Sequence, residues 1–81
     1  MATYSDVMRT NTDTSHKVAR NVSAALGEAG IGQRDLEVRT GIPLRTLSRR
    51  LTGNSPFNTD ELALIADTLG VNVSEFFGGA R

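Results

Sequence analysis

The sequence has 81 residues, which is enough for one small domain and leaves no room for a second. Nine basic residues balance nine acidic ones, and a formal net charge of zero argues, as a single sum, against a nucleic-acid binder. The absence of cysteine excludes disulfides, thiolate zinc sites and cysteine catalysis, and a Ser–His nucleophile pair would have to use the one histidine, His16, in the polar N-terminal stretch. No membrane span or signal peptide is recognisable, so we expect a soluble, intracellular, non-enzymatic protein.

The first stretch, residues 1–16, is polar and rich in Thr, Ser, Asn and Asp. Because such a segment buries little apolar surface, we expect a flexible arm with no more than a turn of helix near Tyr4–Met8. A first helix is predicted over about residues 17–29, where apolar residues recur at steps of three and four, and it ends before Gly30. Its predicted buried face consists of Val18, Val22, Ala25, Leu26 and Ala29.

Two short helices are predicted next, over about residues 33–40 and 43–52. Pro43 suits the first turn of the later helix, because the missing N–H has no partner to lose there. Gly41 and Gly53 follow the two helices at positions that favour a positive φ. The predicted inward positions of the pair are Leu36, Thr40, Leu47 and Leu51.

A fourth helix is predicted over about residues 59–69, and a fifth, of one or two turns, over about 73–78. Asn58 with Glu61 three residues later has the pattern of a capping box at the start of the fourth helix. No segment alternates with the period of two that a strand requires, so the predicted fold class is all-α. The apolar positions of these two helices are Leu62, Ile65, Ala66, Leu69, Val73, Phe76 and Phe77.

The second and third helices are joined by a tight turn built on Gly41 and Ile42, which is the helix-turn-helix arrangement. The basic charge is concentrated in the same segment, because residues 33–53 hold five arginines against two acidic residues, a net charge of +3. Residues 54–80 hold four acidic residues and no basic one. This polarity predicts oriented, salt-sensitive DNA binding of modest affinity that relies on two subunits.

A set of positions matches a known pattern. They are Leu36, Gly41, Ile42, Leu47 and Gly53, followed by ELALIADTLGVNVSEFF over residues 61–77. With them, residues 17–78 resemble the lambda-repressor/Cro-like helix-turn-helix family, also called the Xre family. The resemblance implies a compact five-helix DNA-binding domain over 17–78, between the arm of residues 1–16 and a tail of residues 79–81. It further implies a dimeric transcriptional regulator of bacteria or phages, without cofactor or metal.

The resemblance also implies which residues contact DNA, with the third helix in the major groove. The implied base contacts are Leu44, Arg45 and Arg49. Arg45 and Arg49 lie one turn apart, and an arginine fork pairs with guanine, whereas Leu44 suits a thymine methyl group. The implied phosphate contacts are Gln33, Arg34, Thr46, Ser48, Arg50, Asn54 and Ser55. For Arg34, Arg39 and Arg50, an ion pair with a neighbouring acidic residue is an alternative of equal weight.

Two subunits would place their third helices in successive major grooves, about 34 Å apart, on a pseudo-palindromic operator. The candidate dimer interface is Phe57, Phe76 and Phe77. Three rings are core by default, but a domain of this size has little core to hide them, so we expect one at the interface. The acidic residues Asp60, Glu61, Asp67 and Glu75 are expected on a solvated face, without the His or Cys of a metal site.

Three features of the sequence, at four positions, depart from the pattern of the family. Glu37 stands where the family usually has Ala, either at the rim of the domain or paired, for example with Arg50. Leu26 and Leu51 stand where many members have a buried ion pair, and we expect an apolar contact instead. Arg50 replaces an apolar residue and is expected to add charge near the DNA.

Two functions from different classes remain open. The first is a sequence-specific repressor of the Cro type, acting in the cytoplasm of a bacterium or of a phage-infected host, in association with the nucleoid. The second is a protein-interaction module on the same fold, an antitoxin or antirepressor partner that uses the acidic C-terminal helices. An enzyme lacks support, because the sequence offers no nucleophile–base pair, metal-ligand cluster or glycine-rich phosphate loop.

Overall fold

The computed structural model describes residues 4–78, including the side chains from residue 14 onward. Four α-helices and one 3-10 helix follow one another along this part of the chain, which contains no strand. They are α1 (Tyr4–Ala29), α2 (Gln33–Thr40), α3 (Leu44–Leu51), α4 (Thr59–Leu69) and η1 (Val73–Phe76). The all-α prediction is confirmed. The fifth helix, η1, is shorter than expected and is a 3-10 turn, so residues 4–78 hold four α-helices.

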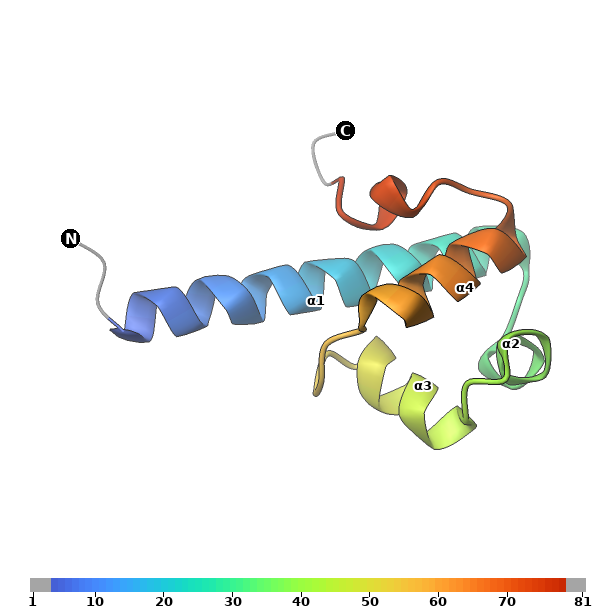
Figure 1. Ribbon diagram of the computed structural model, residues 1–81, viewed down its shortest axis with the longest axis horizontal. Helices are drawn as coiled ribbons and strands as arrows, with labels where there is room; N and C mark the ends of the chain where they lie inside the picture. The colour runs from blue at the N-terminus through green and yellow to red at the C-terminus, as the bar shows by residue number, and fades with distance from the viewer. Residues whose placement is uncertain (1–3, 79–81) are drawn as a thin grey trace.

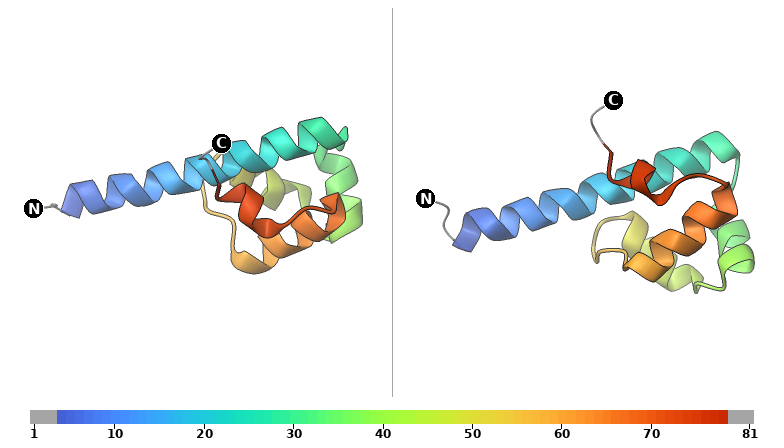
Figure 2. Two further views of the ribbon diagram at one scale, coloured as in Figure 1. Left: turned by 90° about the horizontal axis from the view of Figure 1, so that it is seen from above. Right: turned by 45° about the horizontal axis from the view of Figure 1, so that its top comes forward.

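The start of α1 differs most from the sequence prediction. The helix begins at Tyr4, so the backbone of residues 4–16 continues the helix expected over 17–29 instead of forming an arm. No glycine or proline interrupts residues 4–26, and a helix that is anchored at one end extends at little cost through such a segment. The N-terminal part of α1 projects past the other helices (Figures 1 and 2). The remainder of the expected arm and the tail of residues 79–81 lie outside the described residues.

One apolar core holds the helices together. α2 packs against α3 and α4, α3 also packs against α1, and η1 packs against α1 and α4. The fully buried Leu36 and Leu47 carry α2 and α3 into this core. The buried members of the core are Val18, Val22, Leu26, Leu36, Ile42, Leu47, Leu62, Ile65, Ala66 and Phe76. Ala29, predicted on the buried face of α1, is exposed.

The expected apolar replacement of an ion pair fits this core, because Leu26 is buried in it and Leu51 packs against it. The predicted capping box is also confirmed. Asn58 Oδ1 accepts from the Glu61 N–H at 2.7 Å, and a Glu61 carboxylate oxygen accepts from the Asn58 N–H at 3.0 Å. This box fixes the start of α4 and orients the Glu61 side chain.

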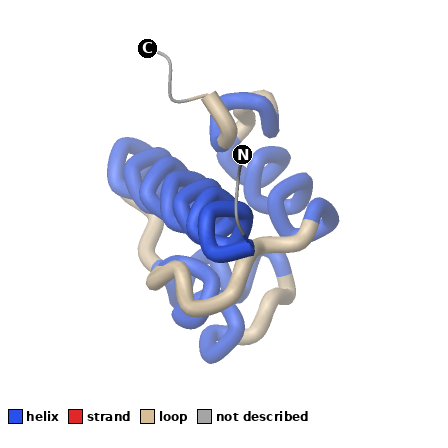
Figure 3. Tube along the Cα trace, turned by 90° about the vertical axis from the view of Figure 1, so that its left-hand side faces the viewer, coloured by secondary structure: helices blue, strands red, loops and turns tan. Residues whose placement is uncertain are grey.

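The helix-turn-helix pair and the C-terminal segment lie on opposite sides of α1 and α4 (Figures 1 and 3). Within the described residues, α2 and α3 make no packing contact with η1. The basic segment of the sequence is thereby separated in space from η1 and its Glu75. Although α1 is long, none of the described helices has the apolarity of a membrane span.

Candidate nucleic-acid interface

The turn between α2 and α3 is closed by backbone and side-chain hydrogen bonds. Gly41, with φ +79°, donates its N–H to the carbonyl of Glu37 at 2.8 Å. Thr40 Oγ1 donates to the carbonyl of Leu36 at 2.7 Å and accepts from the Ile42 N–H at 3.2 Å. Because Ile42 is buried, this turn sets the direction in which α3 leaves α2.

Glu37 caps the start of α3. Its Oε2 accepts from the Leu44 N–H at 2.9 Å, at a helix end where Pro43 offers no side-chain cap. The carboxylate therefore satisfies one free N–H and faces the positive end of the helix dipole. The suggested pairing of Glu37 with Arg50 is wrong, since Glu37 bonds to the α3 backbone and Arg50 has another partner.

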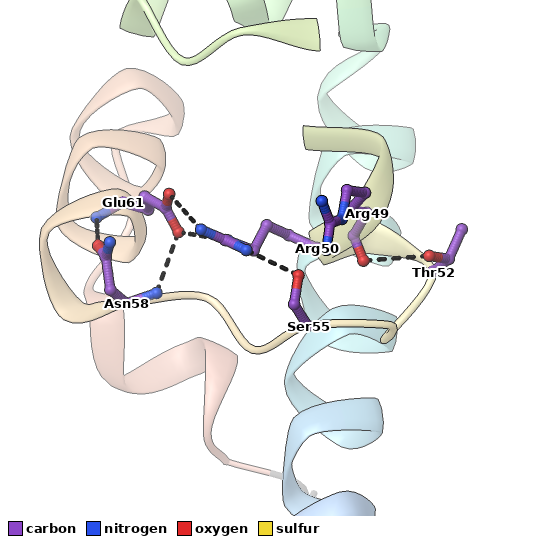
Figure 4. Close-up of polar contacts among 6 residues, drawn as sticks. All are labelled: Arg49, Arg50, Thr52, Ser55, Asn58 and Glu61. Carbon is purple, nitrogen blue, oxygen red and sulfur yellow. Dashed lines mark hydrogen bonds and ion pairs between the residues drawn. The ribbon is translucent and has the colours of Figure 1, made fainter. Parts of the chain in front are cut away.

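Arg50 is bound to α4 and to the α3–α4 loop. Its Nε and Nη2 donate to the two carboxylate oxygens of Glu61 at 2.9 and 3.2 Å, and its Nη1 donates to Ser55 Oγ at 2.7 Å (Figure 4). The two charged side chains are only 23% and 12% exposed. Of the two alternatives for Arg50, the ion pair is the one present, and the expectation of a free phosphate contact is not retained. Glu61 likewise leaves the predicted solvated face, whereas Asp60, Asp67 and Glu75 are exposed.

The pair shifts the pKa of both groups. Partial burial by itself raises the pKa of Glu61, but the hydrogen bonds from Arg50 and from the Asn58 N–H outweigh burial and hold this pKa below its usual value. The hydrogen bond to Glu61 raises the pKa of Arg50 against the opposing effect of burial. Both shifts favour the charged forms, so the ion pair is intact at neutral pH.

The three predicted base contacts lie in the first two turns of α3. Arg45 and Arg49 are exposed, one helical turn apart, and Leu44 is half-buried at the helix start. Within the described part of the chain, neither guanidinium has an ion-pair or hydrogen-bond partner, unlike Arg39, which pairs with Asp35 at 3.1 Å. Two cationic forks are thus free on the face of a helix whose other side is anchored by Leu47.

The remaining predicted phosphate contacts border α3. Gln33 and Arg34 are exposed at the start of α2, where Gly32 provides no side-chain cap. Ser48 and Asn54 are exposed, whereas Thr46 and Ser55 are half-buried. Asn54 and Ser55 belong to the loop, and both donate their N–H to the Arg49 carbonyl, at 3.1 and 3.4 Å. These two bonds tie the backbone of the loop to the end of α3.

The three phenylalanine rings predicted at the dimer interface differ in how far they are exposed to solvent. Phe76 is 1% exposed and belongs to the core, so its assignment to a dimer interface is wrong. Phe57 packs half-buried against the same core, whereas Phe77 is 49% exposed. Phe76 and Phe77 differ in exposure because neighbouring residues of a helical turn point in different directions, so that only Phe76 faces the core.

Two contacts were not expected from the sequence. The first is the pairing of Glu61 with Arg50. The capping box in the sequence predicts where the Glu61 carboxylate lies, but it does not predict that Arg50 lies next to it. His16 is exposed, but its ring lies over Gly53, whose φ is +83°, and occupies the place of a Cβ there. The described residues contain no group of His, Asp and Glu that could hold a metal ion.

Comparison with known proteins gave one family. Residues 22–76 match HTH_3, described as helix-turn-helix, and this match covers α2, α3, α4 and the whole of η1 together with the C-terminal part of α1. No curated protein and no solved structure matches the chain.

Proposed function

The chain belongs to the HTH_3 helix-turn-helix family, a family of DNA-binding regulatory domains and not of enzymes, and on this premise we propose that it is a transcriptional repressor of the Cro type. DNA binding and transcription regulation follow from the family. The proposal adds that the protein occupies an operator within a promoter and excludes RNA polymerase, in the cytoplasm of a bacterium or phage-infected host.

The observation that carries the proposal is the state of the arginines in residues 33–53. Arg39 and Arg50 are paired with carboxylates, whereas Arg45 and Arg49 on the exposed side of α3 have no partner within the described residues. An unpaired fork is ready to bind guanine O6 and N7 in the major groove. Leu44, at the start of the same helix, would contact a thymine methyl group.

Phosphate contacts would flank this helix and set its position in the groove. The uncapped first turn of α2 presents free N–H groups beside Gln33 and Arg34, which suits a phosphate oxygen. On the other side of α3, Ser48, Asn54 and Ser55 would lie along the backbone of the DNA. Thr46 is half-buried and would contribute only its hydroxyl group.

Strength of binding would come from two subunits on a pseudo-palindromic operator. The exposed Phe77 is the ring that supports an interface at the C-terminal segment, and the half-buried Phe57 remains a candidate. Sedimentation of the protein with and without operator DNA tests this part of the proposal. A monomer on each half-site, without cooperativity between sites, would contradict it.

The test of the function is a binding assay with duplexes that the wild-type protein selects from a random library. Arg45→Ala and Arg49→Ala are each expected to lose about 1–3 kcal/mol of discrimination against the wrong base at the position that they contact. Arg39→Ala, which removes an exposed arginine already paired with Asp35, is the matched control and should keep the preferred sequence. Unchanged preference in both α3 variants would contradict the assignment of α3 as the reading helix.

One observation favours a second candidate, a protein-interaction module on the same fold. Leu64 is 45% exposed in a shallow hollow on α4 that Asp60, Ala63 and Asp67 also line. An apolar side chain between two carboxylates would suit a basic partner, such as a toxin or an antirepressor. This function predicts weak DNA binding with little salt dependence, and co-purification with the product of a neighbouring gene.

A further inference from the structure

The α3–α4 loop is held by a polar network with Arg50 at its centre (Figure 4). The guanidinium bridges Glu61 on α4 and Ser55 in the loop, and Glu61 is itself held by the backbone N–H of Asn58. Three of the five guanidinium N–H groups are thus used within the protein. The network joins the end of α3, the loop and the start of α4 into one unit.

Ser55 occupies a particular place in this network. Its Oγ accepts the Arg50 Nη1–H at 2.7 Å, so the hydroxyl hydrogen points away from the guanidinium. Within the described residues, this hydroxyl hydrogen has no acceptor. Accepting from a cation polarises a hydroxyl group and makes it a stronger donor to the next acceptor in line. A half-buried serine beside the exposed Asn54 therefore presents a strengthened O–H at the surface of the loop.

We propose that Arg50 is a positioning residue for DNA binding: held by Glu61, it orients the Ser55 hydroxyl as a donor to a DNA phosphate. The inference rests on the proposed function, since it concerns the same interface. Arg50 would act on the DNA through Ser55 and without direct contact. It replaces the simpler expectation that Arg50 binds a phosphate itself.

A direct contact is disfavoured by the electrostatics of the pair. If Arg50 turned to a phosphate, the Glu61 carboxylate would lose both guanidinium hydrogen bonds and would remain, largely buried, near the negative DNA. With Arg50 in place, the carboxylate stays neutralised and the loop meets the DNA with a neutral hydroxyl donor. The two arrangements make opposite predictions when Glu61 loses its charge.

The decisive variant is Glu61→Gln, because glutamine can keep the capping box of α4 while losing the charge and one of the two acceptor oxygens. If Arg50 is a positioning residue, DNA affinity falls about fivefold per subunit, the effect of one lost hydrogen bond. If Arg50 contacts the phosphate itself, the freed guanidinium and the lost negative charge tighten binding. The matched control is Asp35→Asn, which removes a carboxylate from the exposed Arg39 pair and reports the effect of net charge alone.

Two further variants separate positioning from folding. Arg50→Lys keeps the charge but not the fork, and it should weaken binding as much as Ser55→Ala does. The double variant should bind no more weakly than either single one, since both remove the same phosphate contact. All affinities are measured well below the melting temperature of each variant, on the duplex selected by the wild-type protein, together with the salt dependence and the preferred sequence.

The outcomes are distinct. The inference is supported if Glu61→Gln weakens DNA binding without changing the preferred sequence, and if the double variant at Arg50 and Ser55 binds no more weakly than either single variant. Binding by Glu61→Gln that equals or exceeds that of Asp35→Asn, or a Ser55→Ala variant that binds like the wild type, overturns it. Failure of the wild-type protein to select any duplex would instead overturn the proposed function.

Discussion

The two ends of α3 are held to the domain by different chemistry. At its start, the Leu44 N–H donates one hydrogen bond to the Glu37 carboxylate, next to a turn closed by backbone and Thr40 side-chain bonds. At its end, the fork of Arg50 on Glu61 and Ser55 ties the helix to α4 and to the loop. Together with the buried Leu47, these contacts fix the orientation of α3 and of its exposed side chains on the domain.

The difference reflects what each end adjoins. The start of α3 lies against α2, and a short contact across a tight turn is sufficient to fix it. The end of α3 leads into a longer connection, residues 52–58, in which Phe57 packs against the core and Ser55 bonds to Arg50. Charged hydrogen bonds, which are directional, specify such a loop better than apolar contacts do.

The largest effect on stability is expected at Leu47, because both ends of α3 depend on this buried side chain. Leu47→Ala removes a fully buried side chain from the middle of α3 and should lower the free energy of unfolding by about 2–5 kcal/mol. Leu64→Ala, at an exposed position on α4, is the matched control. Urea denaturation of both variants measures the difference, and equal losses would contradict the anchoring role of Leu47.

The two glycines that flank α3, Gly41 and Gly53, test whether the His16 ring contributes to holding the end of the helix. Gly53→Ala and Gly41→Ala both place a Cβ at a positive φ, which costs about 1–2 kcal/mol of unfolding free energy. At Gly53 the new Cβ also displaces the His16 ring, whereas at Gly41 it meets open space. Gly53→Ala should therefore be the more destabilising, as thermal unfolding would show. In a His16→Ala background the two substitutions should cost the same, and a difference that persists would contradict the contact.

A smaller effect is expected at the start of α3. Glu37→Ala leaves the Leu44 N–H without its side-chain acceptor and should cost about 1 kcal/mol, as the loss of a helix cap does. Asp35→Ala, also on α2, removes only an exposed ion pair and should cost less than about 0.5 kcal/mol. Equal stability of the two variants in urea would mean that the cap contributes nothing.

The smallest effect is a dependence on pH at the end of α3. Because the pKa of Glu61 is lowered in the folded protein, the stability that the pair contributes is complete above the usual glutamate pKa of about 4.3 and declines as the pH falls through the lowered value. The difference in unfolding free energy between the wild type and Glu61→Gln should therefore shrink on acidification. Urea denaturation over this pH range measures it, and a constant difference would contradict a charged pair.

Local patterns predicted most of the helices because their causes are local. The helix over residues 33–40 and the one over 59–69 begin and end as expected, since glycines end both and the Asn58–Glu61 box starts the second. The helical state of residues 4–16 was not predicted, because their polar composition argued for disorder, while the absence of any glycine or proline allowed α1 to continue. Composition describes what a segment can bury, and it does not exclude a helix anchored elsewhere.

The sequence by itself determined the all-α class, the helix-turn-helix at residues 33–53 and the concentration of basic charge there, because periodicity, turn chemistry and charge are properties of neighbouring residues. Only the tertiary structure decided which arginines are free. Arg45, Arg49 and Arg50 look alike in the sequence, but the third is neutralised by Glu61, eleven positions further along. The burial of Phe76 and the exposure of Phe77 were decided in the same way, since both depend on what other helices place opposite them.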